Sequence, residues 1–284
     1  MSSEPGAGGL GGGGLGSGGL GGGGLGGSAI VTGAARGIGA AVTARLAAAG
    51  RHVYAVDTCR GEDGGTSYPL GRREDLEAVA AAHPGRVTPV VADAADGAAM
   101  VELVTRVGSE RGDLTSVVAA AAVIAGGDAQ WETGDDVLDR LWREDLLTVW
   151  RTAHASLPSL LRRDPAARPA FVAVASAAGL QGLYHLSAYC TVKHAVVGLV
   201  RGLAADVTGT GVTVAAVCPG STDTPMLAET ARLYGLDDVA PLVAHQAVGR
   251  ALDPDEVAGV VVHACTAGPV LAGAVLTATG GFAG

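Results

Sequence analysis

The sequence predicts an α/β fold of the doubly wound type, in which helices cover both faces of a seven-stranded parallel sheet. From Ser28 onward, short apolar runs alternate with Ala- and Leu-rich stretches of helical period. The short runs are apolar throughout, which is typical of strands buried on both faces of a sheet. Regular alternation of strand and helix indicates βαβ crossovers, and seven strands use the whole chain from residue 28 to residue 284.

The elements follow one another without an internal repeat. Strands are expected at 28–32, 52–57, 86–92, 114–121, 170–176, 212–217 and 270–277. Helices are expected at 37–49, 72–82, 97–110, 135–162, 188–207 and 254–266. About 257 residues fit one large α/β domain better than two average domains.

The first 27 residues differ from the rest in composition. Residues 6–27 are almost wholly glycine, with leucines five positions apart at Leu10, Leu15, Leu20 and Leu25. A spacing of five matches neither the helical nor the strand period, and glycine loses the most entropy on ordering. We expect residues 1–27 to be a disordered tail without an assigned function.

Composition and charge exclude several classes of function. The chain carries a net charge of −9 and no Lys/Arg block, so nucleic acid and membrane surfaces are poor partners. The richest apolar run, 117–125, is too short to span a bilayer. The four cysteines form no C-x-x-C pair, and no two histidines are spaced with other residues as metal ligands are. No catalytic metal is therefore expected. The N-terminus shows no secretory signal, and the expected compartment is the cytoplasm.

A glycine-rich turn joins the first strand to the first helix. It reads Thr32-Gly33-Ala34-Ala35-Arg36-Gly37-Ile38-Gly39, a G-x-x-x-G-x-G spacing. Glycine permits close approach of backbone to a pyrophosphate, and the following helix offers free N–H groups and a positive dipole end. Gly33, Arg36, Gly37, Ile38 and Gly39 are therefore candidates for cofactor binding. An ordinary βα turn is the alternative in a chain this rich in glycine.

Two acidic residues end the next strands. Asp57 lies 57 − 37 = 20 positions after Gly37, the offset of a carboxylate that binds an adenosine ribose. Such a carboxylate repels a 2′-phosphate, which favours NAD over NADP, although Arg60 nearby is a possible acceptor for that phosphate. Asp93 is a candidate contact to the adenine amino group, and a helix-capping role is an equal alternative.

The catalytic candidates lie at the fifth strand and the helix after it. Ser176 ends the strand 170–176, at the edge of the sheet where doubly wound folds bind ligands. Tyr189 and Lys193, four positions apart, share one helix face, so the ammonium lowers the pKa of the phenol from about 10. Tyr189 can then exchange a proton with an alcohol or ketone that Ser176 holds by a hydrogen bond.

Together these residues resemble the short-chain dehydrogenase/reductase family from Ser28 to the C-terminus. The resemblance implies a Rossmann-like domain, hydride transfer between NAD(H) and a secondary alcohol or ketone, and a homodimer or homotetramer. It also implies that the cofactor is lined by Ala121, Tyr189, Lys193, Pro219, Gly220, Thr222 and Thr224. Residues 220–245 would form a substrate lid. Apolar residues in the lid and in 177–187 indicate a hydrophobic substrate, and packing between subunits is an equal alternative.

A narrower resemblance concerns the mycofactocin-coupled branch of the family. Gly71-Arg72-Arg73-Glu74-Asp75-Leu76, Ala125-Gly126-Gly127 and Ala244-His245-Gln246 are similar to that branch, as is the long segment 58–75. In that branch the nicotinamide is thought to stay bound and to exchange electrons with mycofactocin, a peptide-derived redox cofactor. An ordinary dehydrogenase with a surface loop is the alternative.

The sequence departs from the family pattern at two places near the expected site. Ala120-Ala121-Ala122-Val123 stands where the family has Asn-Asn-Ala-Gly, and Asp145 stands where a helix Asn supplies a backbone carbonyl to the proton relay. We expect that carbonyl to serve here too, with the extra carboxylate raising the pKa of Lys193 and Tyr189. These departures leave open a non-catalytic NAD-binding regulatory module, or a non-redox dehydratase or aromatase.

Overall fold

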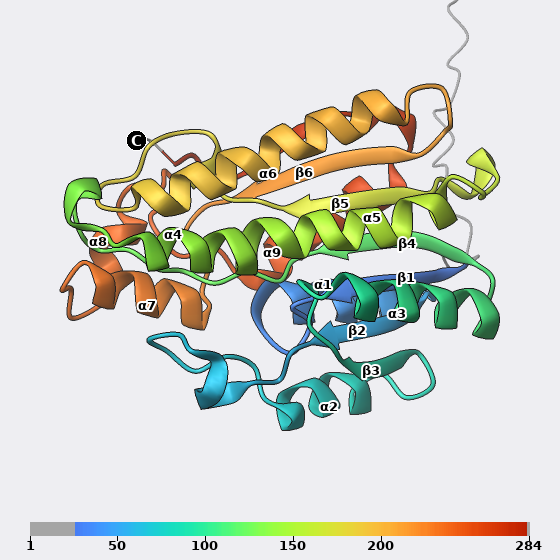
Figure 1. The fold of residues 1–284 in the computed structure, drawn as a ribbon, viewed down its shortest axis with the longest axis horizontal. Coiled ribbons are helices and arrows are strands. Elements are labelled where there is room, and N and C mark those ends of the chain that lie inside the picture. The colour runs from blue at the N-terminus through green and yellow to red at the C-terminus, as the bar shows by residue number, and fades with distance from the viewer. Residues whose placement is uncertain (1–25, 283–284) are drawn as a thin grey trace, which may run out of the picture.

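The computed structural model describes residues 26–282, which form a parallel sheet between two layers of helices (Figure 1). The seven strands pair in the order β3-β2-β1-β4-β5-β6-β7, and every pairing is parallel. They are β1 (Ser28–Thr32), β2 (His52–Asp57), β3 (Val87–Val91), β4 (Leu114–Ala119), β5 (Ala170–Val174), β6 (Thr213–Pro219) and β7 (Val275–Ala278). The predicted doubly wound fold is confirmed, and the predicted tail lies almost wholly outside the described residues.

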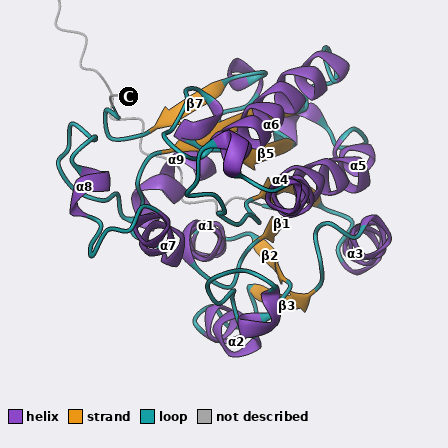
Figure 2. Ribbon diagram, turned by 60° about the vertical axis from the view of Figure 1, so that its left-hand side comes forward, coloured by secondary structure: helices purple, strands orange, loops and turns teal. Residues whose placement is uncertain are grey.

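Helices cover both faces of the sheet, as the view in Figure 2 makes clear. One face packs against α1 (Gly37–Ala48) and α9 (Pro254–Thr266), which also pack against each other. The other face carries α3 (Gly97–Glu110), α5 (Thr148–Leu160) and α6 (Ser187–Asp206). The helix α2 (Arg73–Ala81) lies against β2 and β3 at the sheet edge. Each face has its own apolar core, centred on Ile30, Phe171 and Val214 on one side and Val31, Val118 and Val172 on the other.

The edge strands differ from the central ones. Side chains of β1, β4, β5 and β6 are buried throughout, whereas in β3 only Val87 is buried and the remaining side chains are half-buried or exposed. The edge position also explains why β3 tolerates Pro89, which cannot donate a hydrogen bond to a neighbour. The expected last strand, 270–277, is shorter than predicted and begins at Val275. Pro269–Leu271 forms a 3-10 turn, and Gly273 has φ +72°, so the chain before Val275 is not extended.

The long predicted helix 135–162 is interrupted. The helix α4 (Asp135–Leu141) continues into a π-helical turn, Trp142–Leu147, and then into α5. A π turn inserts an extra residue and changes which side chains face the core, and such turns occur mostly at functional sites. Here it contains Asp145, which is fully buried.

The predicted lid contains two helices that the sequence pattern did not indicate. They are α7 (Pro225–Leu233) and α8 (Ala240–Val243), and both begin with a proline in their first turn. Figures 1 and 2 show both helices beyond the ends of the central strands, outside the two main helical layers.

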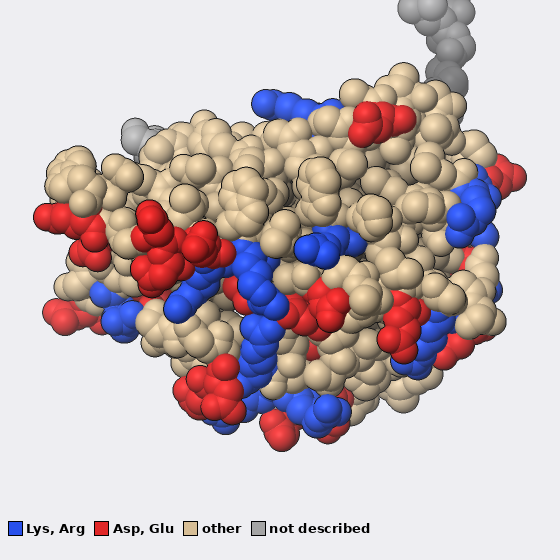
Figure 3. Space-filling view, in the orientation of Figure 1, with Lys and Arg blue, Asp and Glu red and all other residues tan. Residues whose placement is uncertain are grey.

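Acidic and basic side chains are interspersed on the face of the molecule that Figure 3 shows. A narrow run of basic side chains passes down the middle of this face, with acidic side chains on either side of it. Within residues 26–282, no helix combines the length and apolar character needed to cross a bilayer.

Candidate functional site

A cavity of about 660 Å³ opens at the carboxyl ends of the central strands. Its walls come from the turn after β1, the ends of β5 and β6, the start of α6, and the lid. Doubly wound folds bind ligands at this edge, where the strand order reverses between β1 and β4. The cavity is thus the place to look for each residue that the sequence singled out.

The glycine-rich turn forms one end of the cavity. Gly33, Arg36, Gly37, Ile38 and Gly39 all line it. Gly33 and Gly37 have φ of +67° and +55°, conformations that side chains disfavour. A Cβ on Gly39 would lie 2.1 Å from the Gly33 carbonyl oxygen, so the first turn of α1 packs directly on backbone. The result is a cradle of exposed backbone at the N-terminus of α1, which suits a diphosphate.

Asp57 lies at the end of β2 beside this cradle. Its carboxylate accepts hydrogen bonds from the backbone N–H groups of Ala35 and Cys59, each at 3.1 Å. It borders both the main cavity and a smaller one of about 60 Å³. The smaller cavity is also lined by Asp93 and Ala121, as expected for an adenosine end.

Asp93 takes part in an ion-pair network around the smaller cavity. Its Oδ2 lies 2.5 Å from both Arg60 Nη2 and Arg143 Nη2, and Arg60 also contacts Glu144 at 3.2 Å. Its Oδ1 accepts from Ala95 N, the turn role left open as the alternative. Because two carboxylates engage Arg60, this guanidinium is not free to accept a phosphate in this structure.

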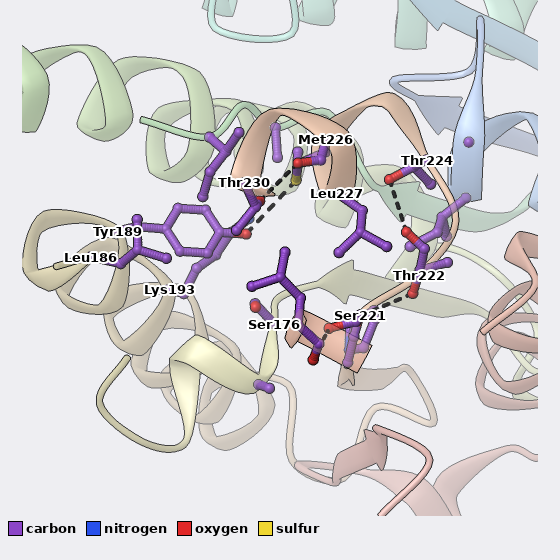
Figure 4. A pocket seen from close by; sticks show the side chains of 18 of the residues that line it. Ser176, Leu186, Tyr189, Lys193, Ser221, Thr222, Thr224, Met226, Leu227 and Thr230 are labelled. Carbon is purple, nitrogen blue, oxygen red and sulfur yellow. Dashed lines mark hydrogen bonds between the residues drawn. The ribbon is translucent and has the colours of Figure 1, made fainter. Parts of the chain in front are cut away.

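Ser176, Tyr189 and Lys193 come together in the middle of the cavity (Figure 4). Ser176 follows β5 and caps a 3-10 turn by accepting from Ala178 N at 3.1 Å. Tyr189 and Lys193 lie in the first two turns of α6, and the ammonium Nζ is 5.4 Å from the phenol ring centre. Tyr189 Oη points at Met226 Sδ of α7, at 4.0 Å.

Asp145 contacts Lys193 through its side chain, a contact additional to the role expected of its backbone carbonyl, which stays a prediction. Asp145 Oδ2 lies 3.0 Å from Lys193 Nζ, and Oδ1 accepts from Val123 N at 2.8 Å. The backbone carbonyl is instead within 3.2 Å of the Thr148 hydroxyl. The π turn sets the rotation of the helix at Asp145, which the sequence pattern did not reveal.

Burial and these charges decide the protonation of the group. Burial raises the pKa of Tyr189, Lys193 lowers it, and Asp145 raises it again, so the net direction is upward. Burial alone would lower the pKa of Lys193, but Asp145 and Tyr189 outweigh it and raise that pKa. Burial also raises the pKa of Asp145, against the opposing effects of Lys193 and the Val123 N–H. Because Lys193 Nζ lies 3.0 Å from Asp145 Oδ2, we assign the resting group as a neutral phenol beside an ammonium–carboxylate pair.

The segment after β6 lines the opposite wall. Pro219, Gly220, Thr222 and Thr224 all border the cavity, as the resemblance implied. The threonine hydroxyls are held by backbone carbonyls, Thr222 to Gly220 and Thr224 to Thr222, at 3.0 and 3.2 Å. Neither hydroxyl proton is needed to satisfy a side chain, so both oxygens can accept from or donate to a ligand after small rotations.

The segment 58–72 between β2 and α2, here named the strap, contributes a residue that the sequence analysis missed. Tyr68 is buried and lines the main cavity, with its hydroxyl 3.3 Å from Ile124 N. Arg36 donates to the Pro69 carbonyl and lies over the Tyr68 ring, 5.5 Å from its centre. A lone aromatic residue in a loop rich in glycine and charge was the only available signal.

The far end of the cavity is apolar. It is lined by Ile124, Leu183, Tyr184, Leu186, Met226, Leu227, Tyr234, Leu236, Pro241, Leu242, His245 and Phe282. Most of these residues come from the lid and from the loop before α6. Of the side chains here, Ile124 and Phe282 lie outside the expected lid and the 177–187 loop.

The described residues contain no cluster of three or more His, Cys, Asp or Glu side chains suited to a metal ion. A nicotinamide dinucleotide fits the residues that are present. Gly33, Gly37 and Gly39 leave backbone without side chains at the N-terminus of α1, and Asp57 presents a carboxylate where a ribose diol would lie. Lys193 and Tyr189 lie farther along the same cavity.

Three comparisons agree with this geometry. An uncharacterized NAD-dependent oxidoreductase of Mycobacterium tuberculosis is 34% identical over 243 residues, 82% of this chain and 87% of that protein. Carveol dehydrogenase of Mycobacterium avium, solved with NAD, superposes with a TM-score of 0.80 at 27% identity, covering 90% of this chain and 97% of that one. A protein of Beutenbergia cavernae assigned as an NAD(P)-dependent gluconate 5-dehydrogenase, solved with NADP, gives 0.75 at 29%, covering 90% and 96%.

The family model for short chain dehydrogenases matches residues 28–234, which include the glycine-rich turn, Asp57, Ser176, Tyr189 and Lys193. The match extends over most of the sheet and ends at the close of α7. This chain therefore belongs to the short-chain dehydrogenase/reductase family and is an oxidoreductase that uses a nicotinamide cofactor.

Proposed function

We propose that this enzyme interconverts a hydrophobic secondary alcohol and its ketone with NAD(H), and that Tyr189 is the general acid/base. The observation that carries the proposal is the convergence of Ser176, Tyr189 and Lys193 in a cavity with a phosphate cradle at one end and apolar walls at the other. The carveol dehydrogenase of Mycobacterium avium acts on a small apolar alcohol by its name, which supports the same substrate class.

The residues would divide the work as follows. The nicotinamide, when bound, supplies or accepts the hydride. The Ser176 hydroxyl would hold the substrate oxygen, and Tyr189 Oη would donate a proton to it in ketone reduction or remove one in alcohol oxidation. Lys193 stabilises the phenolate that forms in the reductive direction. The lid, residues 220–245, would exclude water through Met226 and its apolar neighbours.

NAD is proposed over NADP because Asp57 presents a carboxylate at the adenosine end. A 2′-phosphate there would face this fixed negative charge, and Arg60 is already engaged by Asp93 and Glu144. In fluorescence titrations of the protein, NADH should bind more tightly than NADPH. Asp57→Ala should reduce that preference, whereas exposed Asp139→Asn should leave it unchanged.

The main proposal is tested by incubating the enzyme with NADH and each of a panel of apolar ketones, and by monitoring turnover as loss of the absorbance of reduced nicotinamide. Consumption of NADH in step with alcohol formation supports the proposal. Binding without turnover on any ketone or alcohol would favour a non-catalytic regulatory module. Loss of water from a substrate without any change in nicotinamide absorbance would favour a dehydratase or aromatase.

A specific observation favours a second candidate, in which the cofactor stays bound and mycofactocin is the external electron partner. The strap is anchored at four points around the proposed cofactor site. Arg60 contacts Asp93, Arg36 holds the Pro69 carbonyl, the Tyr68 hydroxyl meets Ile124 N, and Ser67 donates to Glu229 of α7. A nucleotide under this strap could leave only after several of these contacts had broken.

The retained-cofactor candidate is tested by measuring what the purified protein contains. Mass spectrometry after denaturation should find NAD(H), and added NADH should not exchange with it over hours. Ser67→Ala should speed the release of NAD(H) about tenfold, because it removes the hydrogen bond to the Glu229 carboxylate, and such a bond contributes about 1.5 kcal/mol. Ser109→Ala, on the exposed side of α3, is the matched control. An empty site that exchanges NADH freely would make this an ordinary dehydrogenase.

We also propose that the enzyme is a homodimer or homotetramer. All three tryptophans are exposed, and Trp142 and Trp150 lie on the continuous stretch from α4 through α5, with exposed fractions of 47% and 54%. Large apolar side chains exposed together mark contact surfaces. Light scattering should give a mass of two or four chains, and Trp150→Glu should lower it. A monomer at micromolar concentration would contradict the proposal.

A further inference from the structure

We infer that Asp145 is a positioning residue that holds Lys193 and cancels its charge, so that Tyr189 stays a neutral phenol into alkaline pH. The inference rests on the proposed role of Tyr189 as acid/base. It concerns the side-chain carboxylate of Asp145, which the sequence led us to expect near Lys193 and Tyr189 and which the structure places in direct contact with Lys193.

The ion pair is unlike the others in the described part of the chain. Asp145 and Lys193 are 0% and 2% exposed, and in no other ion pair between residues 26 and 282 are both side chains this buried. The Asp145 carboxylate is fixed at both oxygens, Oδ2 by Lys193 Nζ at 3.0 Å and Oδ1 by Val123 N at 2.8 Å.

The position of Asp145 follows from the π turn. This turn brings Asp145 inward. Thr148, three positions later, places its hydroxyl 3.2 Å from the Asp145 carbonyl. The carboxylate, and not the backbone, is the group of residue 145 that reaches Lys193.

Other titratable groups near the pair do not replace this charge balance. Those that face it are Cys190 on α6, Cys218 on β6, Tyr68 of the strap and Glu144 of the π turn. The two thiols and Tyr68 have raised pKa values because of burial, so they are neutral near pH 7. Glu144 is directed to Arg60 and Arg143, which offset its charge.

The consequence for Tyr189 follows from counting charges. With a phenol, the ammonium and the carboxylate sum to zero, whereas a phenolate leaves one net negative charge in a buried site. Burial makes an unbalanced charge unfavourable. Without Asp145 the same ionisation would produce a balanced phenolate–ammonium pair. Asp145 thereby opposes the ionisation that Lys193 promotes.

Asp145 also restrains the loop after β4, which carries Ala120-Ala121 in place of two amide side chains. Thr32 Oγ1 accepts from Ala120 N and Ala121 N, and Asp145 holds Val123 N. A test must therefore separate charge from shape. Asp145→Asn keeps an oxygen that can accept from Val123 N and removes only the charge. Asp139→Asn removes a charge from an exposed site on the same helical stretch.

The decisive measurement is an ultraviolet titration of tyrosinate in the cofactor-free protein, with each trace corrected by the matching protein that carries Tyr189→Phe. Asp145→Asn should lower the ionisation midpoint of Tyr189 by about one pH unit or more. Asp139→Asn should leave it unchanged. A midpoint in Asp145→Asn equal to that of the unaltered protein would overturn the inference. Because no substrate or cofactor is used, this failure is distinct from failure of the proposed reaction.

A stability cycle provides an independent measurement should Asp145→Asn fold poorly. Lys193→Met leaves the carboxylate buried without a partner, which should lower the free energy of unfolding strongly. Adding Asp145→Asn to Lys193→Met should recover part of that loss. A double variant less stable than Lys193→Met alone would show that Asp145 does not act as the counter-ion of Lys193.

Discussion

At the scale of single residues, the chemistry depends on groups that are distant in the sequence but adjacent in the cavity. Ser176 and Tyr189 could be grouped from the sequence because a strand-end serine and a Tyr-x-x-x-Lys helix both point to the same edge of the sheet. Asp145 could be placed near them but its contact could not be predicted, because a π turn sets its direction. Tyr68 was missed, since loops give no periodic signal.

Replacing Tyr189 by Phe should abolish most of the turnover while leaving cofactor binding intact. The proposed proton transfer contributes about 10²- to 10⁴-fold to such reactions, and the ring itself is retained. Steady-state assays with the best ketone measure the loss of turnover, and NADH titrations of the same protein measure whether cofactor binding is retained. Turnover within a few-fold of the unaltered enzyme would assign the acid/base role to another group.

The pH dependence of the two directions should differ in sign. Tyr189 has a raised pKa, because its burial and Asp145 outweigh the effect of Lys193. Oxidation needs the phenolate, so its rate should still be rising above pH 9. Reduction needs the phenol and should remain near its maximum across the neutral range. Initial rates in both directions from pH 6 to pH 10 provide the measurement; an oxidation rate already level at pH 7 contradicts it.

At the scale of elements, buried strands were the easiest to predict and irregular helices the hardest. The strands β1 and β2 begin and end where the apolar runs do. The expected strand 170–176 stops at Val174, because Ser176 is used to cap the turn that follows. The lid helices α7 and α8 are short and contain few residues, so their apolar pattern is too brief to recognise.

The turn before α1 should tolerate no side chain at Gly39. Because a Cβ would lie 2.1 Å from the Gly33 carbonyl oxygen, Gly39→Ala forces strand and helix apart. We expect a loss of about 1–3 kcal/mol in the free energy of unfolding and weaker NADH binding. Gly198→Ala, where α6 has open space, should instead stabilise by about 0.5–1 kcal/mol. Urea denaturation of the pair decides; equal stability of the two variants would contradict the packing described.

At the scale of the whole molecule, the parallel doubly wound sheet and the edge at which ligands bind were predictable, because alternating strands and helices indicate βαβ crossovers. The order of the strands came from the structure alone. The sequence could not show that strap and lid touch. Their contact joins Ser67 of the strap to Glu229 of α7, 162 positions later. No local sequence pattern indicates a contact between segments so far apart.

The free energy of unfolding should fall as the pH is lowered from about 5 to 2. Asp93, Glu110, Glu229, Asp255 and Glu256 all have lowered pKa values, that of Glu256 falling to about 2 through its bonds to Arg250 and Asp253. A lowered pKa stabilises the fold above the unfolded value and loses that contribution as these groups are protonated. The unfolding temperature should therefore fall steadily from about pH 5 to pH 2. Calorimetry that shows a constant temperature over this range would exclude these pairs as a source of stability.

The hydrogen bond between Ser67 and Glu229 links the two halves of the ligand site energetically. The strap borders the smaller cavity, which we propose for the adenosine, and α7 carries Met226 and Leu227 into the apolar end of the main cavity. Because of this hydrogen bond, a substrate that moves α7 inward also moves the strap. A dinucleotide that orders the strap likewise positions α7. Reciprocity requires that each ligand change the affinity of the other by the same factor. Cooperative binding of alcohol and dinucleotide, equal in both orders of addition, is the expected property of a chain built this way.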